Sequence, residues 1–551
     1  MTERRFTPAF QPPDPDPRPT AGLMAGAFAE ASPVDPKLPV RLVSSPSLNR
    51  QTVILHTAHY AGATYGSRAL AAIRSFINAR WLGPELYGFC GTLAFINSFA
   101  YHLHAGVQDM LVKEIPTQRS HGRQDQAARL TQIGWTFLLG MLLIASAGLG
   151  LRGWLSSSST PAVFRWGWWI AALALPLEVL STFERAIARA EERFVDISRA
   201  LWASTLASVG LTAWLVIRYG VVGFYAVAIL TPVCTLWLLH RHASYRWRPT
   251  WSWPELRPLL RAGWPAVAMT MVFDVIGWID RGLVLSFLGV SAFGYYALAT
   301  MLMQCGFVLP EVFASVVEPR LYAHYASAGR LDHVREHVWF PLHTLAWLMP
   351  LGVGVVNWVL PPLVRRWLPA YTPGLGAMRV LIWGSCFMGL IVCTKSLIIT
   401  LGLQRRVLWF YGIAIAVHLA TGLTCALRGW GLVGIAGATV LAYAVCCTQL
   451  LYFAARCFGY SGPAALLHTA GLYVPIALVW GSTVALPWAA RKMPASSWPV
   501  PVAGIKGIAL AILVLIAWRQ LTRRAMKGVA AVSVSQPVLA PSAVAASSEG
   551  L

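Results

Sequence analysis

The chain has 551 residues, of which 56% are hydrophobic and only 12% are charged, and its mean hydropathy is +0.57. A soluble chain carries about 25% charged residues, so this composition excludes an ordinary soluble protein and indicates helices that cross a membrane many times. The net charge of +22 would suggest a nucleic-acid partner in a soluble protein, but basic cytoplasmic loops explain it here, and we expect no nucleic-acid binding.

The chain begins with a polar segment over residues 1–50 that is rich in proline, which predicts a disordered cytoplasmic arm. The tail over residues 521–551 is rich in Ala, Ser and Val and is also predicted to be disordered. Between them, the apolar segments predict about fourteen transmembrane helices. The predicted spans are 53–80, 87–110, 130–151, 163–182, 200–217, 220–240, 263–287, 291–312, 339–361, 377–402, 407–427, 431–456, 464–489 and 502–519.

The distribution of Lys and Arg predicts the topology of these spans. With both termini in the cytoplasm, about 29 basic residues fall in inner loops or tails and about 11 fall in outer loops, as the positive-inside rule requires. The connector over residues 183–199 holds several of the inner charges, and we expect it to be a solvated helical extension at the membrane surface.

A short pattern occurs twice, and the second copy lies 206 residues after the first. Leu82–Phe89 and Leu288–Tyr295 both read L-G-x-x-x-[YF]-G-[FY], between two apolar segments. Glycine permits a tight turn, and aromatic residues are frequent where helices leave the bilayer. Two related halves with a site between them are a common plan of transporters, so the repeat predicts that organisation here.

The same shift of 206 residues aligns charged positions on the first and seventh spans. Arg68 corresponds to Asp274, and Arg74 corresponds to Asp280. Charges at membrane depth face a cavity or a partner because exposure to lipid is costly. Two interpretations stay open: Arg–Asp pairs that join the halves or act as a gate, and arginines that bind a diphosphate. Because Arg68 and Arg74 point about 240° apart, we expect one to line the cavity and the other to pair sideways.

Other charged residues complete the candidate site. Arg281 follows Asp280, and Lys395 lies too deep in its span to reach water, so both are candidates for substrate binding. Glu178 and His59 are candidates for proton coupling, although a structural role is the alternative for Glu178. The nine cysteines all lie in apolar segments without metal-binding spacing, so we expect neither a metal site nor a cofactor.

The sequence also resembles a known family. The residues Arg80–Gly88, Lys113–Pro116, Gly294–Ala299, Glu318–Leu321 and Pro361–Tyr371 are similar to those of bacterial polysaccharide transporters. These are the O-antigen and exopolysaccharide flippases of the multidrug/oligosaccharidyl-lipid/polysaccharide exporter superfamily. The resemblance covers roughly residues 50 to 460. It implies an all-α polytopic membrane protein with two pseudo-symmetric six-helix bundles around a central cavity, plus two C-terminal helices.

Composition, which gives the two tails, and this resemblance, which does not include them, together divide the chain into six parts. They are the arm 1–50, the N-terminal bundle 51–240, a cytoplasmic linker 241–262, the C-terminal bundle 263–457, two additional spans in 458–520, and the tail 521–551. The resemblance also implies a monomer in the bacterial inner membrane, with both termini in the cytoplasm. Its partners would be a lipid-linked oligosaccharide, membrane lipids, and the polysaccharide polymerase and chain-length machinery.

The resulting functional hypothesis is a transporter, not an enzyme. It would flip polyprenyl-diphosphate-linked oligosaccharide from the cytoplasmic to the periplasmic leaflet for lipopolysaccharide O-antigen or exopolysaccharide biosynthesis. The alternatives are a flippase for a peptidoglycan lipid precursor, a drug/cation antiporter of the same superfamily, and an integral-membrane glycan polymerase or ligase. A polymerase would need a large outer loop with acids or bases, whereas the predicted outer loops are short.

Overall fold

The computed structural model describes residues 50–156, 161–328, 335–401 and 403–490. All regular elements in these ranges are helices, and none of the described residues forms a strand. The predicted arm up to residue 49, the predicted span 502–519 and the predicted tail 521–551 lie outside the described residues.

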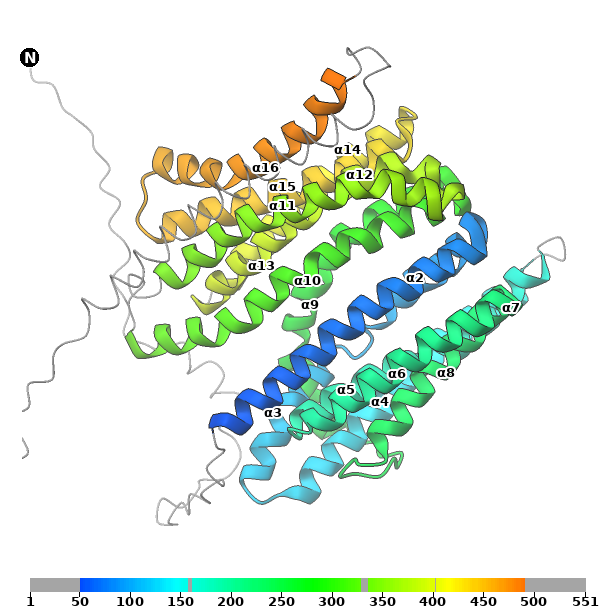
Figure 1. The fold of residues 1–551 in the computed structure, drawn as a ribbon. Helices are drawn as coiled ribbons and strands as arrows, with labels where there is room; N and C mark the ends of the chain where they lie inside the picture. Colours follow the sequence, from blue (N-terminus) through cyan, green and yellow to red (C-terminus); the bar gives the residue numbers. More distant parts are fainter. Residues whose placement is uncertain (1–49, 157–160, 329–334, 402, 491–551) are drawn as a thin grey trace, which may run out of the picture. The chain divides into compact units, whose positions relative to one another are not determined.

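The first half of the chain forms a group of helices that surround one hydrophobic core (Figure 1). Leu111, Ile133 and Phe183 are among its fully buried side chains. The elements are α2 (Arg50–Ala100), α3 (Val107–Ser120), α4 (Gln124–Trp154), α5 (Ala162–Ala190), α6 (Phe194–Leu211), the π-helix η1 (Thr212–Val216), α7 (Ile217–Tyr219) and α8 (Val221–His240).

The second half surrounds a separate core that contains Tyr296, Leu342 and Ile398. Its elements are α9 (Trp253–Leu283), the π-helix η2 (Val284–Leu288), α10 (Gly289–Ala328), α11 (Arg335–Trp367), the 3-10 helix η4 (Pro369–Gly374), α12 (Leu375–Leu381), α13 (Gly384–Thr400), α14 (Gln404–Leu427), α15 (Gly431–Cys457) and α16 (Gly462–Ala490).

These helices cover the predicted spans from 53–80 to 464–489. By length and composition, nine helical stretches of the described residues could cross a membrane. Thus the polytopic all-α prediction is confirmed, whereas the count of fourteen is not. The helix α2 contains the first predicted span and residues 87–100 of the second, and the two meet at the kink Gly83–Pro84, where Gly83 has φ 72°. At the corresponding position of the second copy, Gly289 has φ 83°, so both glycines provide the predicted turn.

The two halves meet along α2 and α10, which lie side by side (Figure 1). The second glycines of the two repeat copies, Gly88 and Gly294, pack against each other's helix. A Cβ atom built on Gly88 would lie 2.0 Å from the carbonyl oxygen of Val290, and one on Gly294 would lie 2.0 Å from that of Pro84. Any side chain here would collide with backbone, so the repeat supplies a close backbone contact between these two helices.

Candidate functional site

Three cavities lie inside the helical assembly, and arginines line all of them. The first has a volume of about 410 Å³ and is enclosed by α2, α5, α6 and α8 of the first half. The second, of about 310 Å³, lies between α2 and α10, and the third, also of about 310 Å³, lies between the Ser98–His102 region and α9, α10 and α15. We call them the N-bundle cavity, the middle cavity and the C-side cavity.

Two arginines lie where neighbouring cavities adjoin. Arg74 of α2 lines both the N-bundle cavity and the middle cavity. Arg281 of α9 lines both the middle cavity and the C-side cavity. Both side chains are partly buried, and neither forms an ion pair among the described residues. Guanidinium groups in such positions are available to an anion that enters between the halves.

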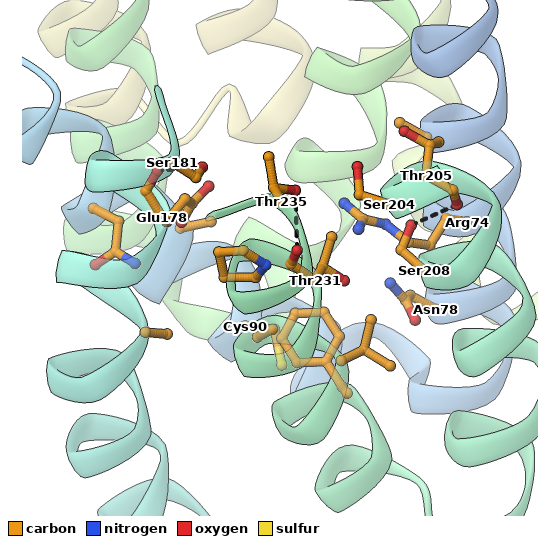
Figure 2. Close-up of a pocket in the computed structure, with 18 of the residues that line it drawn as sticks. Arg74, Asn78, Cys90, Glu178, Ser181, Ser204, Thr205, Ser208, Thr231 and Thr235 are labelled. Carbon is orange, nitrogen blue, oxygen red and sulfur yellow. Dashed lines mark hydrogen bonds between the residues drawn. The ribbon is translucent and has the colours of Figure 1, made fainter. Parts of the chain in front are cut away.

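The N-bundle cavity combines cations with many hydroxyl groups. Figure 2 shows Arg74 and Asn78 on one side of it and Glu178 and Ser181 on the other. Arg68 and Arg185 also line this cavity. The Oε1 atom of Glu178 accepts a hydrogen bond of 2.6 Å from the Tyr101 hydroxyl, so this carboxylate has a fixed position. Arg68 and Arg74 both line one cavity, which differs from the sequence expectation that only one of them would do so.

Side-chain contacts join the halves, but their partners differ from those suggested by the repeat. Arg68 of α2 pairs with Glu311 of α10. Asp274 of α9 pairs with His102, whose Nε2 atom lies 3.2 Å from the Asp274 Oδ2 atom. Arg68 and Asp274, which the repeat aligns, are therefore not in direct contact. A short repeat fixes the depth of a residue in its helix but not the rotation of that helix toward its neighbours.

Asp280 also has partners other than the aligned arginine. It is 1% exposed, and its Oδ2 atom accepts a hydrogen bond of 2.7 Å from the Tyr296 hydroxyl. The Thr439 hydroxyl lies 3.2 Å from the same oxygen, and His418 Nε2 lies 3.2 Å from Thr439. Asp280 thus belongs to a buried network within the second half, and no ion pair joins it to Arg74 among the described residues.

The remaining candidates lie apart from these contacts. Lys395 is partly buried in α13 and is not among the residues that line the three cavities. His59 is exposed near the start of α2. No group of three or more His, Cys, Asp or Glu residues with metal-binding geometry is present in the described part of the chain.

The connector 183–199 is more buried than expected. Glu184 is 2% exposed and accepts hydrogen bonds from the Tyr245 hydroxyl and from Trp247 Nε1, the latter at 2.9 Å. The side chain of Glu191 is 3% exposed and pairs with Arg119 at 2.7 Å. Burial and the nearby Glu184 carboxylate raise the pKa of the Tyr245 phenol. The expectation of a solvated face is therefore wrong, because the 241–252 loop folds onto this segment.

Arg185 and Glu311 are site residues that the sequence did not reveal. Both lie near predicted span ends, where charges ordinarily reach water, so they gave no sign of a cavity role. A helical signal was nevertheless present for Arg185, because Glu178, Ser181 and Arg185 are spaced i, i+3, i+7 and share one face of α5. All three line the N-bundle cavity.

This fold is that of a polytopic, all-helical membrane protein. The family model described as "Polysaccharide biosynthesis protein" matches residues 77–356, which is just over half of the chain. The chain therefore belongs to the polysaccharide biosynthesis protein family, and the resemblance noted from its motifs is confirmed. A search of curated proteins found no match.

Solved structures of several membrane proteins have a similar fold. The lipid II flippase MurJ in an inward closed conformation has a TM-score of 0.62 and 17% identity, over 85% of this chain and 100% of that one. An inward-facing multidrug resistance MATE transporter of the MOP superfamily has a TM-score of 0.59 and 14% identity, covering 74% and 95%. A MOP superfamily transporter from Pyrococcus furiosus has a TM-score of 0.52 and 13% identity, covering 73% and 95%.

Proposed function

We propose that this protein flips a polyprenyl-diphosphate-linked oligosaccharide from the cytoplasmic to the periplasmic leaflet for biosynthesis of a surface polysaccharide, either O-antigen or exopolysaccharide. The observation that carries the proposal is the position of Arg74 and Arg281, one from each half, on either side of the middle cavity. Membership of the polysaccharide biosynthesis protein family supports a glycan substrate.

The physical task explains this arrangement. A hydrated sugar diphosphate loses its hydrogen bonds to water when it enters hydrocarbon, and that loss is prohibitive. Arginines in the middle cavity replace those bonds with forked donors that match phosphate oxygens and stay charged when partly desolvated. The polyprenyl chain is apolar and can stay in the bilayer beside the protein.

Two sets of contacts between the halves could open and close access to the cavities in turn. In this conformation Arg68–Glu311 and His102–Asp274 join the halves at one level. Nearer the Gly83 and Gly289 turns, Arg80 donates a hydrogen bond to the Trp367 carbonyl, and Tyr87 packs edge-on against Tyr371 with ring centroids 6.1 Å apart. Transport would break one set of contacts and then the other. We therefore propose that Asp274 acts in gating, through its contact with His102, and that Asp280 has a structural role.

The remaining sequence-based assignments form part of this proposal. We propose a location in the inner membrane with both termini in the cytoplasm, a monomeric state, and polysaccharide polymerase and chain-length proteins as partners. The bundles would comprise residues 51–240 and 263–457, joined by the linker 241–262 and followed by two helices in 458–520. Glu178 remains a candidate for proton coupling, because its carboxylate lies in the same cavity as Arg74 and Arg185.

The alternatives differ in the ligand that they require. A drug/cation antiporter needs anionic groups, whereas arginines outnumber carboxylates in the N-bundle and middle cavities. A flippase for a peptidoglycan lipid precursor would use the same cationic cavity, and the fold likeness to the lipid II flippase keeps it as the second candidate. A polymerase or ligase has no observation in its favour.

A flipping assay in proteoliposomes tests the proposal. The probe is a fluorescent short-chain polyprenyl diphosphate that carries one N-acetylhexosamine, and the readout is the rate at which it becomes accessible on the opposite leaflet. We expect Arg74→Ala and Arg281→Ala each to lower the rate at least about tenfold, because a buried charge-assisted contact is lost, with Lys variants intermediate. Arg428→Ala, at the exposed end of α14, is the matched control and should flip normally.

Two results would contradict the proposal. If both alanine variants flip the probe at the wild-type rate, the two arginines do not belong to the substrate site. Failure of the wild-type protein to move the probe, together with uptake of lipophilic cations, would favour the antiporter.

A further inference from the structure

The N-bundle cavity has a chemistry that the diphosphate does not explain. Apart from its charged residues, its wall carries hydroxyls from four helices, including Ser67, Ser181, Ser208 and Thr235. The interior of a helix bundle is normally apolar, since a polar group without a partner is costly there. The polar groups in this wall therefore indicate a ligand that forms hydrogen bonds.

The hydroxyls of this cavity are oriented as acceptors. Ser67, Ser181, Ser208 and Thr235 each donate their proton to a carbonyl oxygen of their own helix, at 2.8, 2.7, 2.9 and 3.0 Å respectively. Figure 2 shows two of these bonds, from Ser208 and from Thr235. Because each proton is already used, the oxygen lone pairs are what remain for a ligand.

Two buried amides add unpartnered acceptors. Asn78 is 5% exposed and Asn97 is 9% exposed, and both line the N-bundle cavity. Among the described residues, their Oδ1 atoms have no hydrogen-bond partner, and neither does the hydroxyl oxygen of Thr231. Buried polar atoms are satisfied in nearly all native proteins, so these three oxygens point to a donor that comes with the ligand.

We infer that the N-bundle cavity binds the sugar units next to the diphosphate, through their hydroxyl groups. This inference rests on the proposed function and adds the part of the substrate that this cavity holds. A sugar brings several O–H donors, which match the acceptors of Asn78, Asn97 and Thr231. Arg74 lines both this cavity and the middle cavity, so a diphosphate at Arg74 would place the first sugar in the N-bundle cavity.

Size and polarity agree with a sugar and exclude the lipid. The volume of about 410 Å³ lies within the roughly 300–1,000 Å³ typical of small-molecule sites. A polyprenyl chain would leave the Thr231 hydroxyl and both amide oxygens without partners, at an energetic cost for each. Glu178 fits the same assignment, because a carboxylate accepts hydrogen bonds from sugar hydroxyls while Tyr101 holds it in place.

Binding of two probes to the purified full-length protein tests this inference. One probe is undecaprenyl diphosphate, and the other is undecaprenyl diphosphate that carries a single N-acetylhexosamine. We expect the sugar to raise the affinity of the wild-type protein, and Asn97→Leu or Thr231→Val, neither of which lines the middle cavity, to lower that gain about 5- to 10-fold, the effect of one lost buried hydrogen bond. Affinity for the probe without sugar should not change, which also shows that the variants are folded.

The control and the contrary outcomes separate this inference from the proposed function. Thr424→Val removes a hydroxyl that bonds its own helix on the exposed face of α14, and it should leave both affinities unchanged. Equal affinity of the wild-type protein for the two probes would overturn the sugar assignment while the diphosphate site stands. Equal losses for both probes in the variants would also overturn it. Absence of binding to either probe would contradict the proposed function itself.

Discussion

At the scale of single residues, the occurrence of charged residues within predicted spans predicted part of the candidate site but not which residues form pairs. Arg74 and Arg281 were selected because ionised groups inside a membrane face a cavity or a partner, and both line cavities. Their partners could not be predicted, because contact depends on how each helix is rotated in the packed bundle. Arg68 and Asp274 thus have partners, Glu311 and His102, that no alignment of the two halves would suggest.

The distinction between aligned and paired residues can be tested by charge reversal. Arg74→Asp with Asp280→Arg should show additive losses of stability without recovery, since the two side chains have separate surroundings. Asp280→Arg alone should cost about 3–5 kcal/mol, because it buries an unpaired cation beside Tyr296. Arg68→Glu with Glu311→Arg exchanges a direct pair and should recover most of its loss.

Thermal unfolding of the four single and two double variants in one detergent measures these effects. Recovery in the Arg74/Asp280 double variant would indicate that the two residues meet in another conformation. No recovery in the Arg68/Glu311 double variant would contradict the pair that joins α2 and α10.

At the scale of elements, hydropathy was sufficient to place most spans. The predicted span 431–456 and the helix Gly431–Cys457 differ by one residue at one end. Charge-rich elements were predicted less well. The connector 183–199 was interpreted as solvated, yet α5 continues through it to Ala190 and buries Ile187. The reason is tertiary, since the loop that covers it comes from residues 241–252.

The glycine contact between α2 and α10 gives a prediction at this scale. Gly88→Ala would place its Cβ atom 2.0 Å from the carbonyl oxygen of Val290, and backbone cannot yield as a flexible side chain can. We expect a loss of stability of about 1–3 kcal/mol, as in other overpacked sites, because the helices must separate. Gly140→Ala in α4 is the matched control, because nothing lies within 4 Å of its added Cβ atom.

In the control, replacement of this half-buried helical glycine by alanine should stabilise α4 by up to about 1 kcal/mol. Chemical and thermal unfolding of both variants in the same detergent gives the comparison. Wild-type stability in Gly88→Ala would mean that α2 and α10 do not approach closely in the membrane.

At the scale of the whole molecule, the repeat correctly indicated two halves but not how they are connected. The helix α9 belongs to both. Leu256 and Leu259 lie in the core of the first half, whereas Ile276 and Leu283 lie in the core of the second. The predicted span 263–287 starts after Leu256 and Leu259, so hydropathy assigned this charged end of α9 to the linker 241–262, and only packing shows that it belongs to the first half.

Two residues between these ends mark where α9 can bend. Pro265 has no backbone N–H and so cannot bond the carbonyl four residues earlier. Gly263 lies against the backbone of Gly106, and its Cβ atom would be 2.3 Å from the Gly106 carbonyl oxygen. A relative movement of the halves therefore has a natural hinge at residues 263–265, beside the turn that separates α2 from α3.

We predict that Pro265→Ala retains the fold but slows transport, because alanine restores the missing hydrogen bond and stiffens α9. Distances between spin labels at Gln124 and Arg405, which are on exposed positions of the two halves, report the movement. The labels are best attached through unnatural amino acids, since the chain has nine cysteines of its own. The wild-type protein should show two distance populations when substrate is added, and Pro265→Ala should show mainly one.

Proline at position 341, inside α11, offers the control, because that helix lies within the second half. If Pro265→Ala keeps both populations and flips normally while Pro341→Ala does not, the movement is not centred on α9.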